Sequence, residues 1–142
     1  MARILFVEDD PMLREIMTEY LSHHQVVPLT DIEEACAFLE RDPAFELIIT
    51  DYHLQPFDFE ARCYPPGRMT GPDLLTHVRC AGIGIPLVLM SSEVQNDTEL
   101  ALLISGFAGV IRKPPVWTEV LPLIDRLTRG DHDDQILLPT VS

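Results

Sequence analysis

Near its amino terminus the sequence reads Ile4-Leu5-Phe6-Val7-Glu8-Asp9-Asp10-Pro11, a continuous apolar run that ends in three acids and a proline. A strand that is buried on both faces of a parallel sheet has such a continuous run rather than strict alternation. Asp10 followed by Pro11 is typical of a helix start, because aspartate caps free N–H groups and proline suits the first helical position. The stretch therefore predicts a buried strand, a polar turn and a helix in direct succession.

The same pattern recurs four more times along the chain. Further apolar runs occupy residues 26–29, 47–50, 87–90 and 109–111. Helical periodicity follows each run, and we expect helices at 11–21, 32–39, 71–78, 98–105 and 118–127. This alternation predicts an α/β fold in which helices cover both faces of a five-stranded parallel sheet. Pro122 is compatible with the last helix only if that helix begins near Thr118, because N–H groups of the first turn have no intrahelical partner.

Length and charge restrict the function. A chain of 142 residues is about one domain, without room for a second folded output module. Ten Lys and Arg residues against 23 Asp and Glu residues give a formal net charge of −13. Such a charge repels nucleic acids and anionic membranes, and both are excluded as partners. The acidic start does not resemble a signal peptide, and no apolar run reaches the roughly 18 residues of a membrane span, so we expect a cytoplasmic protein.

Cysteine and histidine usage does not indicate a metal site or a disulfide framework. The three cysteines are odd in number, far apart and not in a CxxC motif, and we expect them to be reduced and structural. The histidines lack the spacing of metal ligands, and we expect their side chains to be solvated. These residues are Cys36, Cys63, Cys80, His23, His24, His77 and His132.

Two segments depart from the regular alternation. Residues 55–68 form a proline- and aromatic-bearing loop between the third strand and the third helix, where two to six residues usually suffice. It is either a tolerated insertion or a functional segment. Residues 130–142 form a C-terminal tail that either frays or docks its short apolar patch. We therefore divide the chain into a domain at residues 1–129, with the inserted loop, and this tail.

The residues that follow the predicted strands form a coherent chemical set. In open parallel α/β sheets the functional crevice lies outside the carboxyl ends of the strands. The residues there are Glu8, Asp9, Asp10, Asp51, Ser91, Ser92 and Lys113, which is the chain's only lysine. Converging carboxylates favour a divalent cation, and magnesium prefers oxygen ligands. A carboxylate is also a nucleophile toward phosphorus, so the set predicts metal-assisted phosphoryl transfer onto an aspartate.

Five fragments in the same order resemble the receiver (CheY-like) domain of two-component response regulators. They cover about residues 2–129 and are Ile4–Pro11, Leu47–Leu54, Met69–Leu75, Val88–Ser92 and Val110–Pro114. The resemblance implies a flavodoxin-like, doubly wound (βα)5 fold with the strand order 2-1-3-4-5.

The resemblance also implies a magnesium site and a phosphoacceptor. Asp51 corresponds to the aspartate that takes a phosphoryl group from a histidine kinase or a histidine phosphotransfer protein. Asp9 and Asp51 correspond to direct ligands of Mg²⁺, and Glu8 to a ligand that acts largely through water. The backbone carbonyl of His53 would supply another oxygen.

Three further positions match functional residues of the family. Ser91 corresponds to the hydroxyl residue that hydrogen-bonds the phosphoryl group. Lys113 corresponds to the family's lysine, and Pro114 to the cis proline that usually follows it. His53 and Glu93 occupy positions that tune hydrolysis of the phosphoryl group. Val110 departs from the family, which often has an aromatic switch residue there.

The leading hypothesis is a stand-alone receiver or phosphorelay intermediate, an aspartyl phosphoprotein of signal transduction. It would contact a downstream protein target, or form a homodimer, through the fourth helix, fifth strand and fifth helix. It would be no enzyme beyond catalysing its own phosphorylation and dephosphorylation. Two alternatives remain open at this point. One is a magnesium-dependent phosphohydrolase that uses an aspartyl phosphate, and the other is a degenerate receiver that binds partners without phosphorylation.

Overall fold

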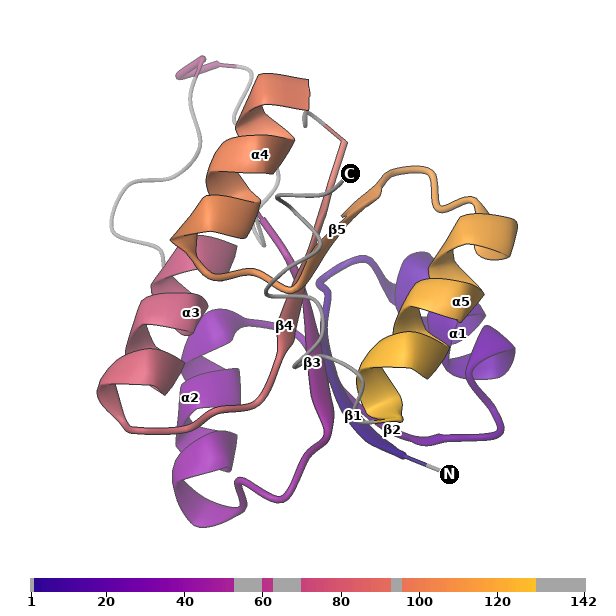
Figure 1. Cartoon of the computed structure of the whole chain (residues 1–142). Helices are drawn as coiled ribbons and strands as arrows, with labels where there is room; N and C mark the ends of the chain where they lie inside the picture. The colour runs from indigo at the N-terminus through magenta and orange to yellow at the C-terminus, as the bar shows by residue number, and fades with distance from the viewer. Residues whose placement is uncertain (1, 53–59, 63–69, 93–95, 130–142) are drawn as a thin grey trace.

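A computed structural model describes residues 2–52, 60–62, 70–92 and 96–129. Within these ranges five strands alternate with five helices (Figure 1). In chain order they are β1 (Arg3–Val7), α1 (Pro11–Tyr20), β2 (Gln25–Leu29), α2 (Ile32–Arg41), β3 (Leu47–Asp51), α3 (Gly71–Cys80), β4 (Leu87–Ser91), α4 (Asn96–Ser105), β5 (Gly109–Arg112) and α5 (Trp117–Thr128). The strands form one parallel sheet in the order β2-β1-β3-β4-β5, which confirms the flavodoxin-like topology.

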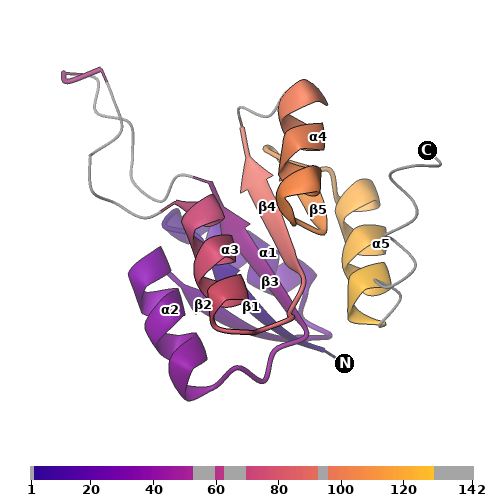
Figure 2. The ribbon, with the colours of Figure 1, turned by 60° about the vertical axis from the view of Figure 1, so that its left-hand side comes forward.

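The sheet separates two apolar cores. On one face α2 and α3 pack against alternate residues of the central strands, and Leu102 of α4 joins them. On the other face α1 and α5 pack against the residues in between. In β1, for example, Leu5 and Val7 face the first core while Ile4 and Phe6 face the second. Figures 1 and 2 show the helices on the two sides of the sheet. Because both faces are covered, the central strands are continuously apolar, as the sequence predicts.

The two outer strands differ from this prediction. We expected every strand to be buried on both sides, but β2 and β5 form the edges of the sheet. In β2 the side chains of Val26 and Val27 are only half-buried, and Pro28 is exposed. Proline has no N–H group for a ladder hydrogen bond, and an edge strand tolerates this loss. The apolar run at 26–29 therefore indicates a strand but overstates its burial.

Helix boundaries agree closely with the sequence pattern. The Asp10 side chain accepts a hydrogen bond from the Met12 N–H at 3.0 Å and caps α1, with Pro11 at its first position. At the start of α3 the Thr70 N–H donates to the Asp73 side chain at 2.7 Å. The fourth helix begins two residues before the expected position, at Asn96.

Proline in α5 has a different explanation from the one the sequence suggested. The helix begins at Trp117, so Pro122 lies in its second turn rather than its first. Its missing N–H would have bonded the carbonyl of Thr118, four residues earlier. Both residues are exposed, so water can solvate that carbonyl. The helix therefore tolerates the proline because the carbonyl that loses its donor faces solvent.

Several side chains lie elsewhere than expected. The His24 side chain is only 7% exposed, so the prediction that it is solvated is wrong. Cys36 is a free, buried cysteine, whereas Cys80 is free but exposed and therefore not part of the core. Trp117 is a packing residue: its ring stacks on that of Tyr20, with centroids 4.0 Å apart, and joins α5 to α1.

The connection between β3 and α3 runs through residues 52–70. Most of the predicted loop at 55–68 lies outside the described residues, as do the tail at 130–142 and Cys63. The domain division and the role of the loop therefore stay predictions. Among the described residues no helix combines the length and the apolar character that a membrane crossing needs.

Gly71 marks a close approach of α3 to the end of β3. Its N–H donates to the Tyr52 carbonyl at 2.9 Å. A Cβ atom at this position would lie 2.6 Å from a methyl carbon of Leu89 and 2.8 Å from the main-chain oxygen of Asp51. Only glycine fits here without moving backbone atoms.

We expect Gly71→Ala to destabilise the domain by about 1–3 kcal/mol, which is typical of overpacking in a dense core. Urea unfolding of both proteins measures the difference. Gly84→Ala is the matched control, because a Cβ atom there meets nothing within 4 Å. Equal free energies of unfolding for wild type and Gly71→Ala would contradict the close approach.

Candidate functional site

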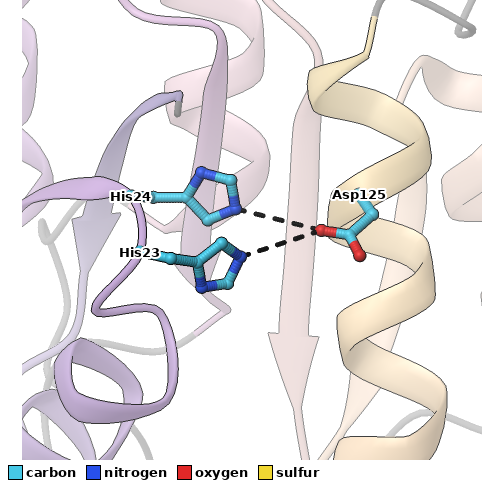
Figure 3. A group of neighbouring side chains, drawn as sticks. All are labelled: His23, His24 and Asp125. Carbon is cyan, nitrogen blue, oxygen red and sulfur yellow. Dashed lines mark ion pairs between the residues drawn. The ribbon is translucent and has the colours of Figure 1, made fainter.

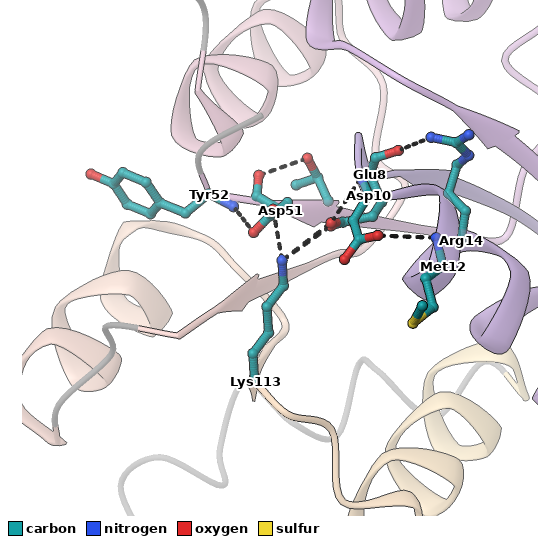
Figure 4. Close-up of polar contacts among 8 residues, drawn as sticks. Glu8, Asp10, Met12, Arg14, Asp51, Tyr52 and Lys113 are labelled. Atoms are coloured by element: carbon teal, nitrogen blue, oxygen red, sulfur yellow. Dashed lines mark hydrogen bonds and ion pairs between the residues drawn. The ribbon is translucent and has the colours of Figure 1, made fainter. Parts of the chain in front are cut away.

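The carboxyl ends of four strands meet at one edge of the sheet. Glu8 follows β1, Asp51 ends β3, Ser91 ends β4 and Lys113 follows β5. The parallel register pairs Asp51 with Met90 and Ser91 with Arg112, so these ends lie level with one another. Glu8, Asp51 and Ser91 are buried, although all three are polar. Residues separated by more than 100 positions in sequence thus form one polar pocket (Figure 4).

Lys113 is the central cation of this pocket. Its ammonium donates to Asp51 Oδ2 at 2.8 Å, and to Glu8 Oε2 and Oε1 at 3.2 and 3.3 Å. The lysine side chain is 21% exposed, whereas those of Glu8 and Asp51 are 1% and 9% exposed. The Lys113–Pro114 peptide bond is cis, as the resemblance implied. The chain's only lysine is therefore an ion-pair partner of both buried acids.

The second carboxylate oxygen of Asp51 is held by the backbone. Asp51 Oδ1 accepts a hydrogen bond from the Tyr52 N–H at 2.9 Å. The Tyr52 N–H also donates to the Met90 carbonyl at 3.0 Å, which ties the end of β3 to β4. With Oδ2 on Lys113, both oxygens of Asp51 have a defined direction (Figure 4).

Arg14 of α1 holds the turn that carries the other acids. Its Nη1 donates to the Glu8 main-chain oxygen at 2.9 Å. The Asp10 N–H donates to Glu8 Oε1 at a longer 3.4 Å. Arg14 was not among the residues predicted from the sequence, although its position four residues after the capping Asp10 places it on the same side of the helix. This spacing is the sequence feature from which Arg14 could have been predicted.

The pocket contains more acids than lysines, and the pKa values of Glu8, Asp9 and Lys113 are raised. Burial, and then the charge of Asp51, raises the pKa of Glu8 to about 8 against the opposing effect of Lys113. Burial followed by the charge of Asp51 also raises the pKa of Asp9. Burial works to lower the pKa of Lys113, but the hydrogen bond and charge of Asp51, with those of Glu8, outweigh it and raise that pKa. The pocket is therefore short of positive charge.

The three acids fit a hard divalent cation. Glu8, Asp9 and Asp51 each place a carboxylate oxygen within 4.8 Å of the others. Magnesium is typically held by one or two carboxylates together with waters and phosphate oxygens. A cation here would also offset the charge of Asp51, which after burial is the main cause of the raised pKa of Glu8. The donor set and the electrostatics thus agree on one kind of ion.

The remaining predicted residues have different outcomes. Ser91 is buried at the end of β4, and its carbonyl accepts the Lys113 N–H at 3.0 Å, which places it beside the lysine. Ser92 is exposed. His53 and Glu93 lie outside the described residues, so their predicted roles stay predictions.

Solved structures with this fold are receiver domains. The non-phosphorylated HemR receiver domain from Leptospira biflexa is 28% identical, with a TM-score of 0.71 over 90% of this chain and 94% of that one. The signal receiver domain of a LuxO repressor protein from Vibrio parahaemolyticus is 21% identical, with a TM-score of 0.76 over 95% and 96%. The chain therefore has the fold of the response regulator receiver domains. No protein-family model matches the sequence.

Curated relatives of this receiver are longer proteins. The response regulator protein FleR of Pseudomonas aeruginosa is 30% identical over 131 residues, which are 91% of this chain and 25% of FleR. The glycerol metabolism activator of Pseudomonas putida is 24% identical over 135 residues, which are 92% of this chain and 56% of that protein. The chain thus spans about a quarter and about half of these two relatives.

We expect magnesium binding at neutral pH to release a proton, mainly from Glu8. With a pKa of about 8 this carboxyl is mostly protonated at neutral pH, whereas a ligand of the ion must be ionised. For the same reason the affinity for magnesium rises as the pH rises toward 8. Calorimetric titration in two buffers of different ionisation enthalpy measures the released protons.

Glu8→Gln removes the titrating group and should release clearly fewer protons than the wild type. Asp10→Asn is the matched control, because Asp10 lies in the same turn but is exposed and caps α1. Equal proton release from the wild type and Glu8→Gln would show that Glu8 does not carry the proton.

Proposed function

We propose that this receiver accepts a phosphoryl group on Asp51 from a histidine kinase or a histidine phosphotransfer protein, with Mg²⁺ bound by Glu8, Asp9 and Asp51. The observation that carries the proposal is the Asp51 carboxylate at the end of β3. It is buried, contacts the only lysine at 2.8 Å, and lies within 4.8 Å of two further acids. A carboxylate in such a setting is a nucleophile with its counter-charges already in place.

The transfer follows from the chemistry of these groups. A carboxylate oxygen of Asp51 attacks phosphorus, an O–P bond forms, and the bond from phosphorus to the donor nitrogen breaks with its electrons going to that nitrogen. The backbone bond from Tyr52 to Oδ1 fixes the orientation of the carboxylate. Magnesium, when bound, neutralises charge on the transferred phosphoryl oxygens.

Lys113 and Ser91 would act on the phosphorylated state. The Lys113 ammonium already lies against Asp51 and is placed to pair with the added phosphoryl oxygens. Ser91 ends the neighbouring strand and is buried next to Lys113, so its hydroxyl is the nearest candidate to donate to the same group. These two residues would turn the new charge into a rearrangement of β4 and β5.

The output surface in this proposal comprises α4, β5 and α5. Ile104 is 76% exposed at the end of α4, and Val116 is 51% exposed at the start of α5. The proposed occupant of this surface is a downstream protein target or a second copy of the chain, which would cover these side chains. Val110 is half-buried in β5, so a change there does not involve an aromatic ring.

Acetyl phosphate or phosphoramidate with Mg²⁺ should add one phosphoryl group to the wild-type chain, detected as an intact mass. Asp51→Asn should abolish the addition, because an amide is not a nucleophile of this kind. Asp73→Asn is the matched control, since Asp73 is an exposed acid whose side chain caps α3.

Two results would reject the proposal. One is a wild type that binds Mg²⁺ but remains unmodified, which favours a degenerate receiver that binds partners without phosphorylation. The other is repeated turnover of a small phosphomonoester, which favours the phosphohydrolase.

A further inference from the structure

A second group of polar side chains lies at the opposite end of the sheet from Asp51. His23 and His24 lie in the turn that precedes β2, and Asp125 lies in the second half of α5. Both histidine side chains point toward the aspartate (Figure 3). The Nε2 atoms of His23 and His24 are 4.0 and 3.9 Å from Asp125 Oδ1. One ligand atom from each residue lies within 4.8 Å of the other two.

The buried histidine supplies an independent observation. The His24 side chain is only 7% exposed, and its Nδ1 accepts a hydrogen bond from the Ala2 N–H at 2.9 Å. Its Nε2 is fully buried and makes no hydrogen bond to any residue within the described ranges. A buried polar nitrogen without a partner calls for an explanation. This nitrogen faces the Asp125 carboxylate (Figure 3).

We propose that His23, His24 and Asp125 bind a divalent transition-metal ion of the zinc class. Two imidazole nitrogens and one carboxylate oxygen are a common ligand set for zinc, with the remaining position left to water. Magnesium prefers oxygen ligands and would not compete for this set.

The three ligand atoms need to move only slightly to reach the distances of a zinc site. Zinc ligands lie about 2.0–2.2 Å from the ion, so the three ligand atoms must approach each other slightly. The His23 and Asp125 side chains are 59% and 52% exposed and have room to turn inward, whereas His24 is fixed by its surroundings. One rigid ligand and two adjustable ones thus face the same point.

Coordination would change the position of one proton. A neutral imidazole carries a single N–H, and because His24 Nδ1 accepts from Ala2 the proton lies on Nε2. Binding of the metal at Nε2 transfers this proton, through solvent, to Nδ1. Nδ1 then no longer accepts the Ala2 N–H, so metal binding exchanges this hydrogen bond for a coordinate bond. The Ala2 amide therefore reports on occupancy.

The ionisation of His24 is compatible with this exchange. Burial, and then the neighbouring His23, lowers the pKa of His24 against the opposing charge of Asp125. The ring is therefore neutral at neutral pH, which is the form that binds metals.

Calorimetric titration with zinc chloride, with Mg²⁺ in excess to occupy the acidic pocket, tests the site. The wild type should bind one zinc ion per chain, and the Ala2 amide signal should shift in nuclear magnetic resonance spectra. His23→Ala and Asp125→Asn should each weaken binding by at least about tenfold, since even indirect partners of a metal site cost that much. Both residues are exposed, so neither variant depends on the core.

Three matched variants separate this site from other zinc ligands. His77→Ala removes a half-buried histidine whose Nε2 lies 3.9 Å from Glu40, and Cys80→Ser removes an exposed thiol. Both should leave the affinity unchanged, as should Asp51→Asn in the acidic pocket. The proposal is wrong if the wild type takes up no zinc, or if its affinity is lost in one of these three variants and retained in His23→Ala and Asp125→Asn.

Discussion

The fold depends on a charge imbalance at the carboxyl ends of its strands. Glu8, Asp9 and Asp51 converge there, and Lys113 is the cation that pairs with the carboxylates of Glu8 and Asp51. Two unit charges about 4 Å apart interact by about 4 kcal/mol at an effective dielectric constant of 20. One ammonium cannot offset three such carboxylates, and burial, followed by the charge of Asp51, raises the pKa of Glu8 to about 8. A proton on Glu8 removes one negative charge, which a divalent cation would otherwise offset.

The sheet and its two cores allow the fold to hold such an arrangement. Each central strand contributes alternate side chains to both cores, so its carboxyl end cannot shift without disturbing packing on two sides. Gly71 brings α3 against the Asp51 carbonyl, and Arg14 holds the Glu8 carbonyl from the opposite core. Backbone contacts therefore fix both acids from both faces of the sheet. Apolar burial in the two cores supplies the free energy that opposes the repulsion between these acids.

The α/β class and the members of the pocket could be predicted from the sequence because both depend on local patterns, whereas the strand order was implied only by the resemblance to receiver domains. Continuous apolar runs mark the strands, and in a parallel sheet the residues after each run must meet at one edge. Burial at the edges was not predictable in this way, since a run such as residues 26–29 does not state which strand is outermost. The hydrogen bond of Arg14 to Glu8 also escaped prediction, because an arginine on an amphipathic helix is usually solvated.

His24 shows a different limit of sequence reasoning. Two adjacent histidines have no metal-binding spacing of their own, and their partner Asp125 lies about a hundred positions away on another element. The side chains come together only because α1 and α5 share one face of the sheet, where Tyr20 stacks on Trp117. Sites built in this way from a turn and a distant helix are visible only once the topology is known.

The two ends of the sheet are joined mechanically by α5. Its first turn follows the Lys113–Pro114 segment beside Asp51, and its second half carries Asp125. A movement of Lys113 that shifted α5 as a rigid body would also move Asp125. Displacement of α5 on phosphorylation would alter the distance from Asp125 to His23 and His24, and therefore the affinity for a metal. By linkage, the metal would then alter the phosphorylation equilibrium by the same factor, although the two sites share no ligand.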